Sequence, residues 1–220
     1  MVKVKARTIQ DKEARRQAIL GAAAVRFERE RFEAMTMAQL AEDAGLAKGT
    51  VYLYFRTKEE VFLALAEESL ELFFRSLDAG LASGRLFFGP EELATLVTRL
   101  FREQPRLPRL LGLLHPVLEY NVDRARALDF RTFLADHYKR TGKHLEQRLP
   151  SLRDGEGVVL LSRLHALAIG CWQVTDTSPI LREVLEERKF KLFKNEFEPL
   201  FSKSLSALIA GMEEQSRRKK

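Results

Sequence analysis

Apolar residues recur along most of this chain at spacings of three and four, which is the period of an α-helix. Strand-like alternation is scarce, and long stretches are rich in Leu, Ala, Glu and Arg. Only 12 Gly and 7 Pro interrupt the 220 residues, and 45% of the sequence is hydrophobic, enough to fill a core. The pattern therefore predicts an all-α protein. The predicted helices cover about residues 8–32, a pair within 35–54, a long helix from 58, one from about 91, then 156–176 and 197–213.

Residues 36–58 predict two short helices joined by a tight turn. Thr36 is a good N-cap, because its hydroxyl can accept a hydrogen bond from an amide in the first turn. Gly45 stands where the chain must turn and tolerates the left-handed conformation that often ends a helix. Val51 and Phe55, four residues apart, would hold the second helix against the first. The side chains left facing outward are Lys48, Thr50, Tyr52 and Tyr54. A helix-turn-helix of this kind is suited to docking in a DNA major groove.

The segment GLAKGTVYLYFRTKEEVF, which begins at Gly45, resembles the signature of the TetR family of bacterial transcriptional regulators. The resemblance extends upstream through ARRQAILGAAAVRFERERFEAMTM and covers about residues 12–65. It implies an N-terminal three-helix helix-turn-helix DNA-binding domain followed by a larger C-terminal helical domain for ligand binding and dimerisation. We place these domains at residues 1–57, with the motif at about 35–54, and at 58–220. The sequence departs from the family pattern at Ala47, where a small hydroxyl residue is usual, and at Arg31, where Gly is usual.

Charge at the two ends of the chain adds to this interpretation. The net charge is +6, and residues 1–16 hold six basic against two acidic side chains, a local excess of +4. Beside a helix-turn-helix, a basic arm can follow the phosphate backbone or enter the minor groove, although a solvated terminus has the same composition. The basic residues 217–220 are most simply a solvated terminus.

We therefore expect a DNA surface in which Tyr54 and Lys58 hold phosphates, while Lys48, Thr50 and Tyr52 approach base edges. The full predicted DNA-binding set is Arg7, Thr36, Lys48, Gly49, Thr50, Tyr52, Tyr54 and Lys58. A symmetric homodimer would read a palindromic double-stranded DNA operator, with half-sites about 34–36 Å apart or at a longer spacing.

Other function classes find little support. The single cysteine, Cys171, excludes an internal disulfide framework and fits a reducing cytoplasm. The charged N-terminus argues against a signal peptide, and we expect no membrane span because no run of about 20 apolar residues is evident. No phosphate loop, Gly-x-Ser-x-Gly or zincin motif is present, so we expect no enzyme activity and no cofactor. His115 and Glu119 could share a helix face, but no third ligand lies at useful spacing, so we expect no metal.

The section from 91 to 150 is broken by prolines and mixes aromatic bulk with a few polar groups. That composition suits an apolar ligand pocket and, equally, an ordinary helical core. The family resemblance favours a pocket for a small hydrophobic ligand of unknown identity, either uncharged or cationic, since Glu119 could pair with a cation. Pro116, inside an apolar stretch, should kink the helix or start a new turn. The candidate ligand residues are Phe101, Leu114, His115, Leu118, Glu119, Tyr120, Phe130, Phe133 and His137.

The two apolar helices near the C-terminus predict a four-helix dimer interface, which the family also forms with its last two long helices. An intramolecular core is the alternative. The candidate interface residues are Leu161, His165, Ala168, Trp172, Phe197, Phe201, Leu205, Leu208 and Met212. The sequence as a whole thus predicts a cytoplasmic, homodimeric, ligand-responsive repressor. In this reading a ligand tilts the long helix that begins near Lys58 and so changes the spacing of the DNA-reading heads. A DNA-binding adaptor, whose helical body binds a protein and senses no ligand, is the competing reading.

Overall fold

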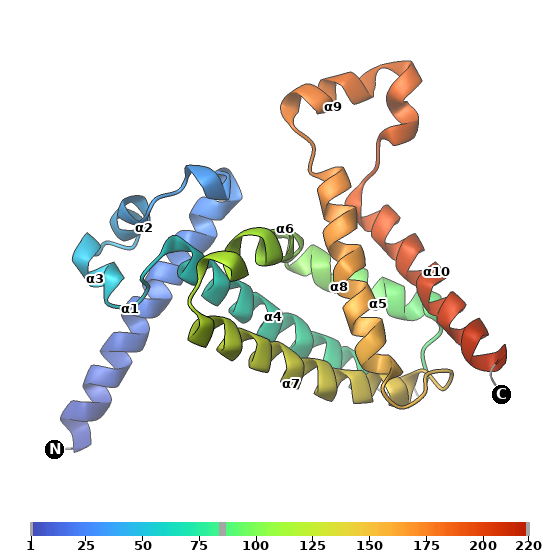
Figure 1. The fold of residues 1–220 in the computed structure, drawn as a ribbon, viewed down its shortest axis with the longest axis horizontal. Coiled ribbons are helices and arrows are strands. Elements are labelled where there is room, and N and C mark those ends of the chain that lie inside the picture. Colours follow the sequence, from blue (N-terminus) through green and yellow to red (C-terminus); the bar gives the residue numbers. More distant parts are fainter. Residues whose placement is uncertain (1, 84–86, 219–220) are drawn as a thin grey trace. The chain divides into compact units, whose positions relative to one another are not determined.

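The computed structural model describes the backbone of residues 2–83 and 87–218, and the side chains of that part from residue 10 onward. Every regular element in the described residues is helical, which confirms the all-α prediction (Figure 1). The elements are α1 (Val2–Arg29), η1 (Phe32–Ala34), α2 (Met37–Asp43), α3 (Lys48–Tyr52), α4 (Lys58–Ala82), α5 (Pro90–Glu103), α6 (Arg106–Leu113), η2 (Leu114–Leu118), η3 (Glu119–Asn121), α7 (Arg124–Arg148), α8 (Glu156–Thr175), α9 (Pro179–Glu186), η4 (Arg188–Phe193) and α10 (Phe197–Arg218).

The predicted helix starts are found close to where capping residues placed them. The long helix α4 begins at Lys58, and α5 begins at Pro90 after Gly89. The Gly89 amide donates to the Glu92 carboxylate at 2.9 Å. Proline suits the first helical position, because the amide it lacks would have no partner within the helix.

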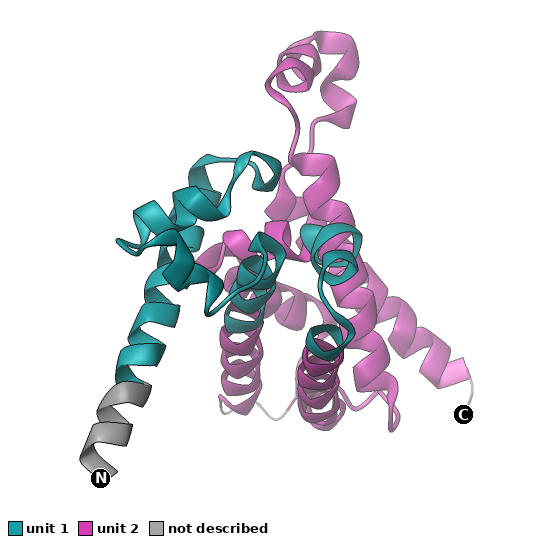
Figure 2. Cartoon of the chain, turned by 60° about the vertical axis from the view of Figure 1, so that its left-hand side comes forward, with its two compact units in different colours: residues 1–68, 113–127 teal, residues 69–112, 128–220 magenta. Residues whose placement is uncertain are grey.

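Two compact units make up the chain (Figure 2). Unit 1 comprises Met1–Glu68 and Leu113–Ala127, and unit 2 comprises Ser69–Gly112 and Leu128–Lys220. The sequence placed the division between residues 57 and 58. Unit 1 is larger than that predicted domain, because it takes in the first part of α4 and a segment, 113–127, that is distant in sequence.

An aromatic cluster forms the centre of unit 1. The ring of Phe62 on α4 lies 5.2 Å from that of Phe27 on α1 and 5.1 Å from that of Phe32 in η1, both in edge-on arrangements. All three side chains are buried. Such edge-to-face pairs add to the stabilisation that burial alone gives. The cluster therefore fixes α1, η1 and the start of α4 as the platform on which α2 and α3 lie.

The segment 113–127 departs from regular helix at Pro116. Helix α6 ends at Leu113, and the residues that follow form one wider π-helical turn and then a short 3-10 turn. Proline has no amide to donate to the carbonyl four residues earlier, and its ring clashes with that carbonyl, so an α-helix cannot continue unchanged through it. The predicted break at Pro116 is confirmed.

Two ion pairs tie this segment into unit 1. Arg126 makes a two-pronged contact with Glu67 on α4, with nitrogen–oxygen distances of 2.7 and 2.6 Å. Asp123 accepts from Arg56 at 3.1 Å and from the backbone amide of Arg126 at 2.8 Å, so it also caps α7. The Arg126 and Glu67 side chains are about one-fifth exposed, at 22% and 21%. A partly buried, two-pronged pair of this kind is directional as well as strong.

In unit 2, α10 packs against α5 and α8. Four of its residues at spacings of three and four, Phe201, Leu205, Ile209 and Met212, are buried on this side. The Phe201 ring lies edge-on to Phe101 of α5 at 5.1 Å. The apolar stripe predicted for the last helix is therefore a core stripe of its own subunit.

Helices α7 and α8 come close together where each carries a glycine. A side-chain carbon built on Gly157 would collide with the backbone of Gly142, and one built on Gly142 would crowd the backbone of Val158 at 3.0 Å. The Gly157 amide also donates to Glu146 of α7 at 3.0 Å. Only glycine allows this approach of two helix backbones.

Helix α8 bears on the expectation that the chain has no membrane span. Its 20 residues have the length and composition to cross a membrane, although only a weak argument follows from one such helix. Core helices of soluble proteins have the same properties, and six α8 residues are buried within the described fold. We therefore interpret α8 as a core helix. Its buried side accounts for the apolar pattern of residues 156–176.

The residues between α8 and α10 form an arm, defined here as residues 176–196, that contains α9 and η4. Figures 1 and 2 show it standing away from the other helices of unit 2. No residue of α9 or η4 is buried.

Candidate functional site

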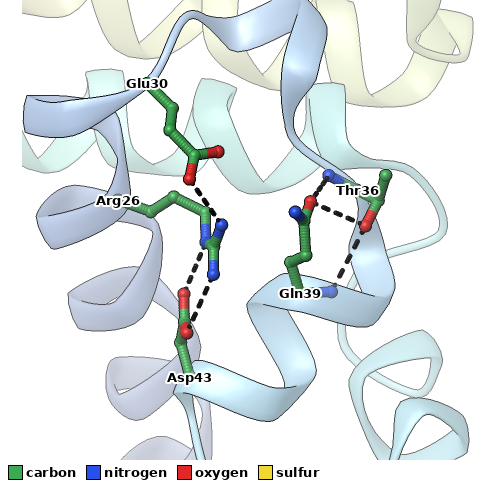
Figure 3. Close-up of polar contacts among 5 residues, drawn as sticks. All are labelled: Arg26, Glu30, Thr36, Gln39 and Asp43. Carbon is green, nitrogen blue, oxygen red and sulfur yellow. Dashed lines mark hydrogen bonds and ion pairs between the residues drawn. The ribbon is translucent and has the colours of Figure 1, made fainter.

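Helix α2 begins at a reciprocal cap. The Thr36 hydroxyl accepts a hydrogen bond from the Gln39 backbone amide at 3.3 Å, and the Gln39 side-chain oxygen accepts one from the Thr36 amide at 2.9 Å (Figure 3). This capping box satisfies two amides that the helix itself leaves unpaired. The predicted N-cap is confirmed, and Met37 and Leu40 then bury their side chains and hold α2 on unit 1.

The turn between α2 and α3 has the predicted chemistry. Gly45 has φ of +65°, the left-handed conformation that glycine adopts without steric cost. The Leu46 amide then returns to the Ala41 carbonyl at 2.9 Å. Helix α3 has only five residues, and its N-cap, Ala47, makes no side-chain hydrogen bond. The helix is therefore short, lacks a side-chain cap and depends on tertiary packing.

That packing comes from Val51, which is fully buried, and from Phe55 one turn later, which is 6% exposed. The opposite side of α3 is open to solvent. Of the predicted DNA-contact residues on this side, Lys48, Gly49 and Tyr52 are exposed and Thr50 and Tyr54 are partly exposed. The Lys48 ammonium lies 6.0 Å from the Tyr52 ring centroid, so the cation and the phenol occupy one patch.

Leu53 is a surface residue that sequence reasoning missed. It is 81% exposed, the most exposed apolar residue of the helix-turn-helix. Because it follows Gly49 by four positions, helical spacing alone places it on the outward face. An exposed leucine there could contact a thymine methyl group in the major groove.

The guanidinium of Arg26 links α1 to α2. Arg26 on α1 donates to Asp43 at the end of α2 at 2.6 and 3.0 Å, and to Glu30 at 2.9 Å (Figure 3). The hydrogen bond from Arg26 lowers the pKa of the Asp43 carboxyl. The same contact raises the pKa of the Arg26 guanidinium. This clamp could not be predicted from the sequence, because nothing in the spacing of Arg26 and Asp43 indicates contact.

The side chain of Lys58 has partners within the protein. Its ammonium donates to the carbonyls of Phe32 and Met35, each at 3.0 Å, and to that of Glu33 at 3.4 Å. It also lies 4.4 Å from the centroid of the Phe32 ring. An ammonium group has three donors, and all three are engaged inside the protein. Lys58 therefore ties the start of α4 to the turn before α2, and its contact with a phosphate stays a prediction.

Two further predicted DNA contacts have limited support. Thr36 is exposed, but its hydroxyl is already used by the capping box. Arg7 belongs to the first turns of α1, where side chains lie outside the described residues. Of the predicted set, the residues on the exposed side of α3 and its following turn keep side chains that are open or partly open to solvent.

The nine candidate ligand residues are divided between the units. Leu114, His115, Leu118, Glu119 and Tyr120 belong to unit 1, and Phe101, Phe130, Phe133 and His137 belong to unit 2. Tyr120 is 85% exposed, and the exposed His115 lies 2.8 Å from the Glu119 carboxylate. Within the described residues, no group of three His, Cys, Asp or Glu side chains could hold a metal ion.

His137 is a core histidine with both ring nitrogens occupied. It is 5% exposed, and its Nε2 lies 2.8 Å from Glu71 on α4. Arg140 approaches Nδ1 at 2.8 Å, and because arginine can only donate, the ring proton lies on Nε2, toward Glu71. The Phe74 ring stacks on the imidazole at 4.9 Å. These contacts join α7 to α4.

A small apolar cavity does lie inside unit 2. It has a volume of about 20 Å³ and takes in only Phe101 from the predicted set. Its polar groups are Tyr138 and His165, whose Oη and Nδ1 lie 3.0 Å apart. Burial raises the pKa of Tyr138 to about 12, so the phenol keeps its proton. The space is close to that of one water molecule. The lining residues are Leu70, Phe73, Phe74, Phe101, Leu107, Leu111, Tyr138, Leu161, Leu164 and His165.

Most of the predicted interface residues lie in the core of the subunit. Leu161, Ala168, Phe201, Leu205 and Met212 are buried, whereas His165, Trp172, Phe197 and Leu208 are partly exposed. The exposed sides of the same two helices carry different residues. The small and apolar ones among them are Val159, Ala166, Gly170 and Val174 on α8 and Ala207, Ala210 and Gly211 on α10, beside exposed polar residues such as Arg163. Side-chain carbons built on Gly170 and Gly211 would meet nothing within 4 Å.

Comparisons with known proteins agree with the helix-turn-helix geometry. Residues 19–65 match the family model described as bacterial regulatory proteins, tetR family, and residues 67–216 match that of the tetracyclin repressor-like C-terminal domain. The chain belongs to the TetR family. A curated relative, the uncharacterized HTH-type transcriptional regulator YfiR of Bacillus subtilis (strain 168), is 41% identical over 71 residues. The match spans 32% of this chain and about a third, 35%, of the relative.

Two solved structures share the fold over nearly the whole chain. The fatty acid degradation regulator FadR from Bacillus halodurans has a TM-score of 0.57 at 17% identity, over 90% of this chain and 95% of that one. FadR of Thermus thermophilus, a TetR-family repressor solved with lauroyl-CoA, has a TM-score of 0.53 at 21% identity, over 89% and 93%. At these identities the likeness is one of fold.

Proposed function

We propose that this TetR-family regulator is a homodimeric, ligand-responsive repressor that binds a palindromic operator through α3. The exposed patch of Lys48, Tyr52 and Leu53 carries the proposal. One cation, one phenol and one apolar group, next to the half-exposed Thr50, supply contacts for both phosphates and base edges. Because the buried Val51 holds the other side of α3, the patch is presented on a rigid support.

Homodimerisation is proposed through the exposed sides of α8 and α10. Ala166 and Gly170 are four residues apart on α8, and Ala207 and Gly211 are four apart on α10. Small residues at this spacing let helices of two subunits approach closely, and Val159 and Val174 add apolar area. A two-fold dimer would use the same surface on both subunits.

The ligand is proposed to be an acyl-chain hydrophobe that enters beside Tyr138 and His165. The lauroyl-CoA bound by the Thermus thermophilus neighbour suggests this class, and the cavity lining is apolar except for that pair. Since about 20 Å³ cannot hold an acyl chain, binding requires the lining helices to move apart. The Glu119 carboxylate is paired with His115 and belongs to unit 1, so an uncharged acyl chain suits the cavity better than a cation.

The chain connectivity offers a route for the signal. Leu107 and Leu111 of α6 line the cavity, and α6 leads directly into the segment 113–127 that belongs to unit 1. There Arg126 holds Glu67 on α4, the helix that follows the helix-turn-helix. A shift of α6 on ligand binding would therefore pull on the Arg126–Glu67 pair.

DNA binding is tested with operators selected from random duplex DNA by the purified protein. We expect Lys48→Ala and Tyr52→Ala each to weaken binding by about 1–3 kcal/mol in fluorescence anisotropy titrations. Lys139→Ala, an exposed lysine on α7, is the matched control and should bind as the wild type does. Wild-type affinity in both α3 variants would remove α3 from the DNA surface.

Ligand response is tested with acyl-CoA esters of increasing chain length, with free coenzyme A as the control. A true ligand should raise the melting temperature and release the operator, and operator should weaken ligand binding by the same factor. Leu164→Trp, which fills the cavity, should block release and leave DNA affinity unchanged.

The small cavity also favours a second function, a DNA-binding adaptor whose helical body binds a protein. In that case no acyl-CoA ester would change operator affinity or melting temperature, whereas the α3 variants would still lose DNA binding. The two assays therefore separate the adaptor from the ligand-responsive repressor.

A further inference from the structure

The arm (residues 176–196) exposes an unusual amount of apolar surface for its length. No residue of α9 or η4 is buried, and five large apolar side chains lie largely in solvent. Their exposed fractions are 76% for Ile180, 45% for Leu181, 37% for Val184, 74% for Leu192 and 59% for Phe193. Contiguous exposed apolar side chains in a soluble protein mark an interaction surface.

The arm is nevertheless an ordered structure. The Ser178 hydroxyl caps α9 by accepting from the Leu181 amide at 3.2 Å, and Pro179 occupies the first helical position. Lys194 pairs with Glu186 at 2.6 Å and so ties the end of η4 back to α9. Helix α9 is amphipathic, with its apolar positions on one side. A capped, internally tied and amphipathic helix without a core of its own is built to pack against something else.

The position of the arm identifies its partner. Its ends join α8 at Thr175 and α10 at Phe197, the two helices whose exposed sides form the proposed dimer interface. The last exposed apolar residue of α8 is Val174, which is 56% exposed, and the next large apolar residue along the chain is Ile180 in the arm. The apolar surface of the arm is thus a continuation of the proposed interface.

We propose that the arm of each subunit packs its apolar side against the second copy of the chain. This inference rests on the proposed dimer and adds a reciprocal clasp to it, since a two-fold axis repeats every contact. In the isolated subunit the arm has no buried contacts to stabilise it, so it should open easily. In the dimer it should be protected.

Limited proteolysis with trypsin tests this difference directly. The arm holds five cleavage sites, at Arg182, Arg188, Lys189, Lys191 and Lys194. Mass spectrometry of the fragments would follow cuts at these sites in the wild-type dimer and in a monomeric variant. We expect the arm to be cut at least about tenfold more slowly in the dimer, because protection follows the population of the open form.

Gly170→Glu supplies the monomeric variant. Its side chain has open space in the subunit, so the fold is kept, while a charge is placed in the proposed α8 interface. Ala135→Glu, on an exposed position of α7, is the control and should stay dimeric with a protected arm. Circular dichroism confirms that both variants are folded.

A second pair of variants acts on the arm itself. Ile180→Asp combined with Leu192→Asp should weaken dimerisation at least about tenfold in sedimentation experiments, because both side chains would become buried charges only in the dimer. Glu183→Lys changes the charge of α9 outside its apolar set and should leave the dimer unchanged.

The outcomes separate the two proposals. A monomeric Gly170→Glu protein whose arm is cut as slowly as in the wild type would overturn the clasp and keep the dimer. Unchanged dimerisation of the Ile180→Asp, Leu192→Asp variant would do the same. A wild-type monomer at micromolar concentration, or a dimeric Gly170→Glu protein, would overturn the proposed interface and the clasp together.

Discussion

Unit 1 and unit 2 use the same building block, the apolar helix, in opposite ways. In the helix-turn-helix of unit 1, short helices bury a few residues such as Leu40 and Val51, and the side chains left outside are the candidate functional groups. In unit 2 the candidate groups, such as Tyr138 and His165, lie among the buried side chains of several long helices. The residues of a surface site can thus be predicted from local helical spacing. Those of an internal site depend on which helices pack against one another.

We expect the largest change in stability from a substitution where α7 and α8 approach closely. Gly157→Ala puts a methyl group into the Gly142 backbone, and we expect a loss of about 3 kcal/mol in unfolding free energy from this overpacking. Gly21 lies on α1 with free space around it, so Gly21→Ala should instead stabilise the protein by about 0.5–1 kcal/mol. Urea denaturation of both variants measures the contrast. Equal effects would mean that the two units do not differ in how closely their helices pack.

A smaller loss is expected at Lys58. Lys58→Ala removes three hydrogen bonds from the ammonium group and should destabilise the protein by about 2 kcal/mol. The salt dependence of operator binding should stay as in the wild type, whereas Lys48→Ala should reduce the salt slope by about 1 if Lys48 meets a phosphate. A reduced slope for Lys58→Ala, with unchanged stability, would support the phosphate role that the sequence suggested.

Because α3 begins without a side-chain cap, adding one should increase the stability of the protein. Ala47→Ser should stabilise the protein by about 1 kcal/mol, because a hydroxyl there can accept from an amide of the first turn. The rise in melting temperature should be accompanied by equal or tighter operator binding. Ala38→Ser, at an exposed position of α2, has no such amide to reach and serves as the control. A lower melting temperature for Ala47→Ser would show that α3 starts elsewhere.

The smallest effect concerns the Arg26–Asp43 clamp. Because contact with Arg26 lowers the pKa of Asp43 in the folded state, the stabilisation is complete above the pKa of the unfolded side chain. It is lost as the pH falls through the lowered pKa. Asp43→Ala should cost about 0.5 kcal/mol near neutral pH, a value reduced by solvent screening. The difference from wild type should shrink below about pH 4. Glu42→Ala, at the exposed neighbouring position, should show no such pH dependence.

The sequence by itself determined the all-α fold, the helix-turn-helix and its family. Thr36, Gly45, Val51 and Pro116 act through their own backbone geometry, their capping bonds or their place in the helical period, so local pattern was enough to predict them. The missing cap at Ala47 was likewise visible in the sequence, because capping involves only residues three positions apart.

Only the tertiary structure decided which helix sides face each other. The Lys58 ammonium donates to carbonyls more than twenty residues away, and the His137 ring joins α7 to α4; neither contact was predicted. An apolar stripe shows that a helix has a buried side and does not show what covers it, so Phe201 was assigned to a dimer and belongs to the subunit core. Contacts between residues far apart in sequence depend on packing, which no local period records.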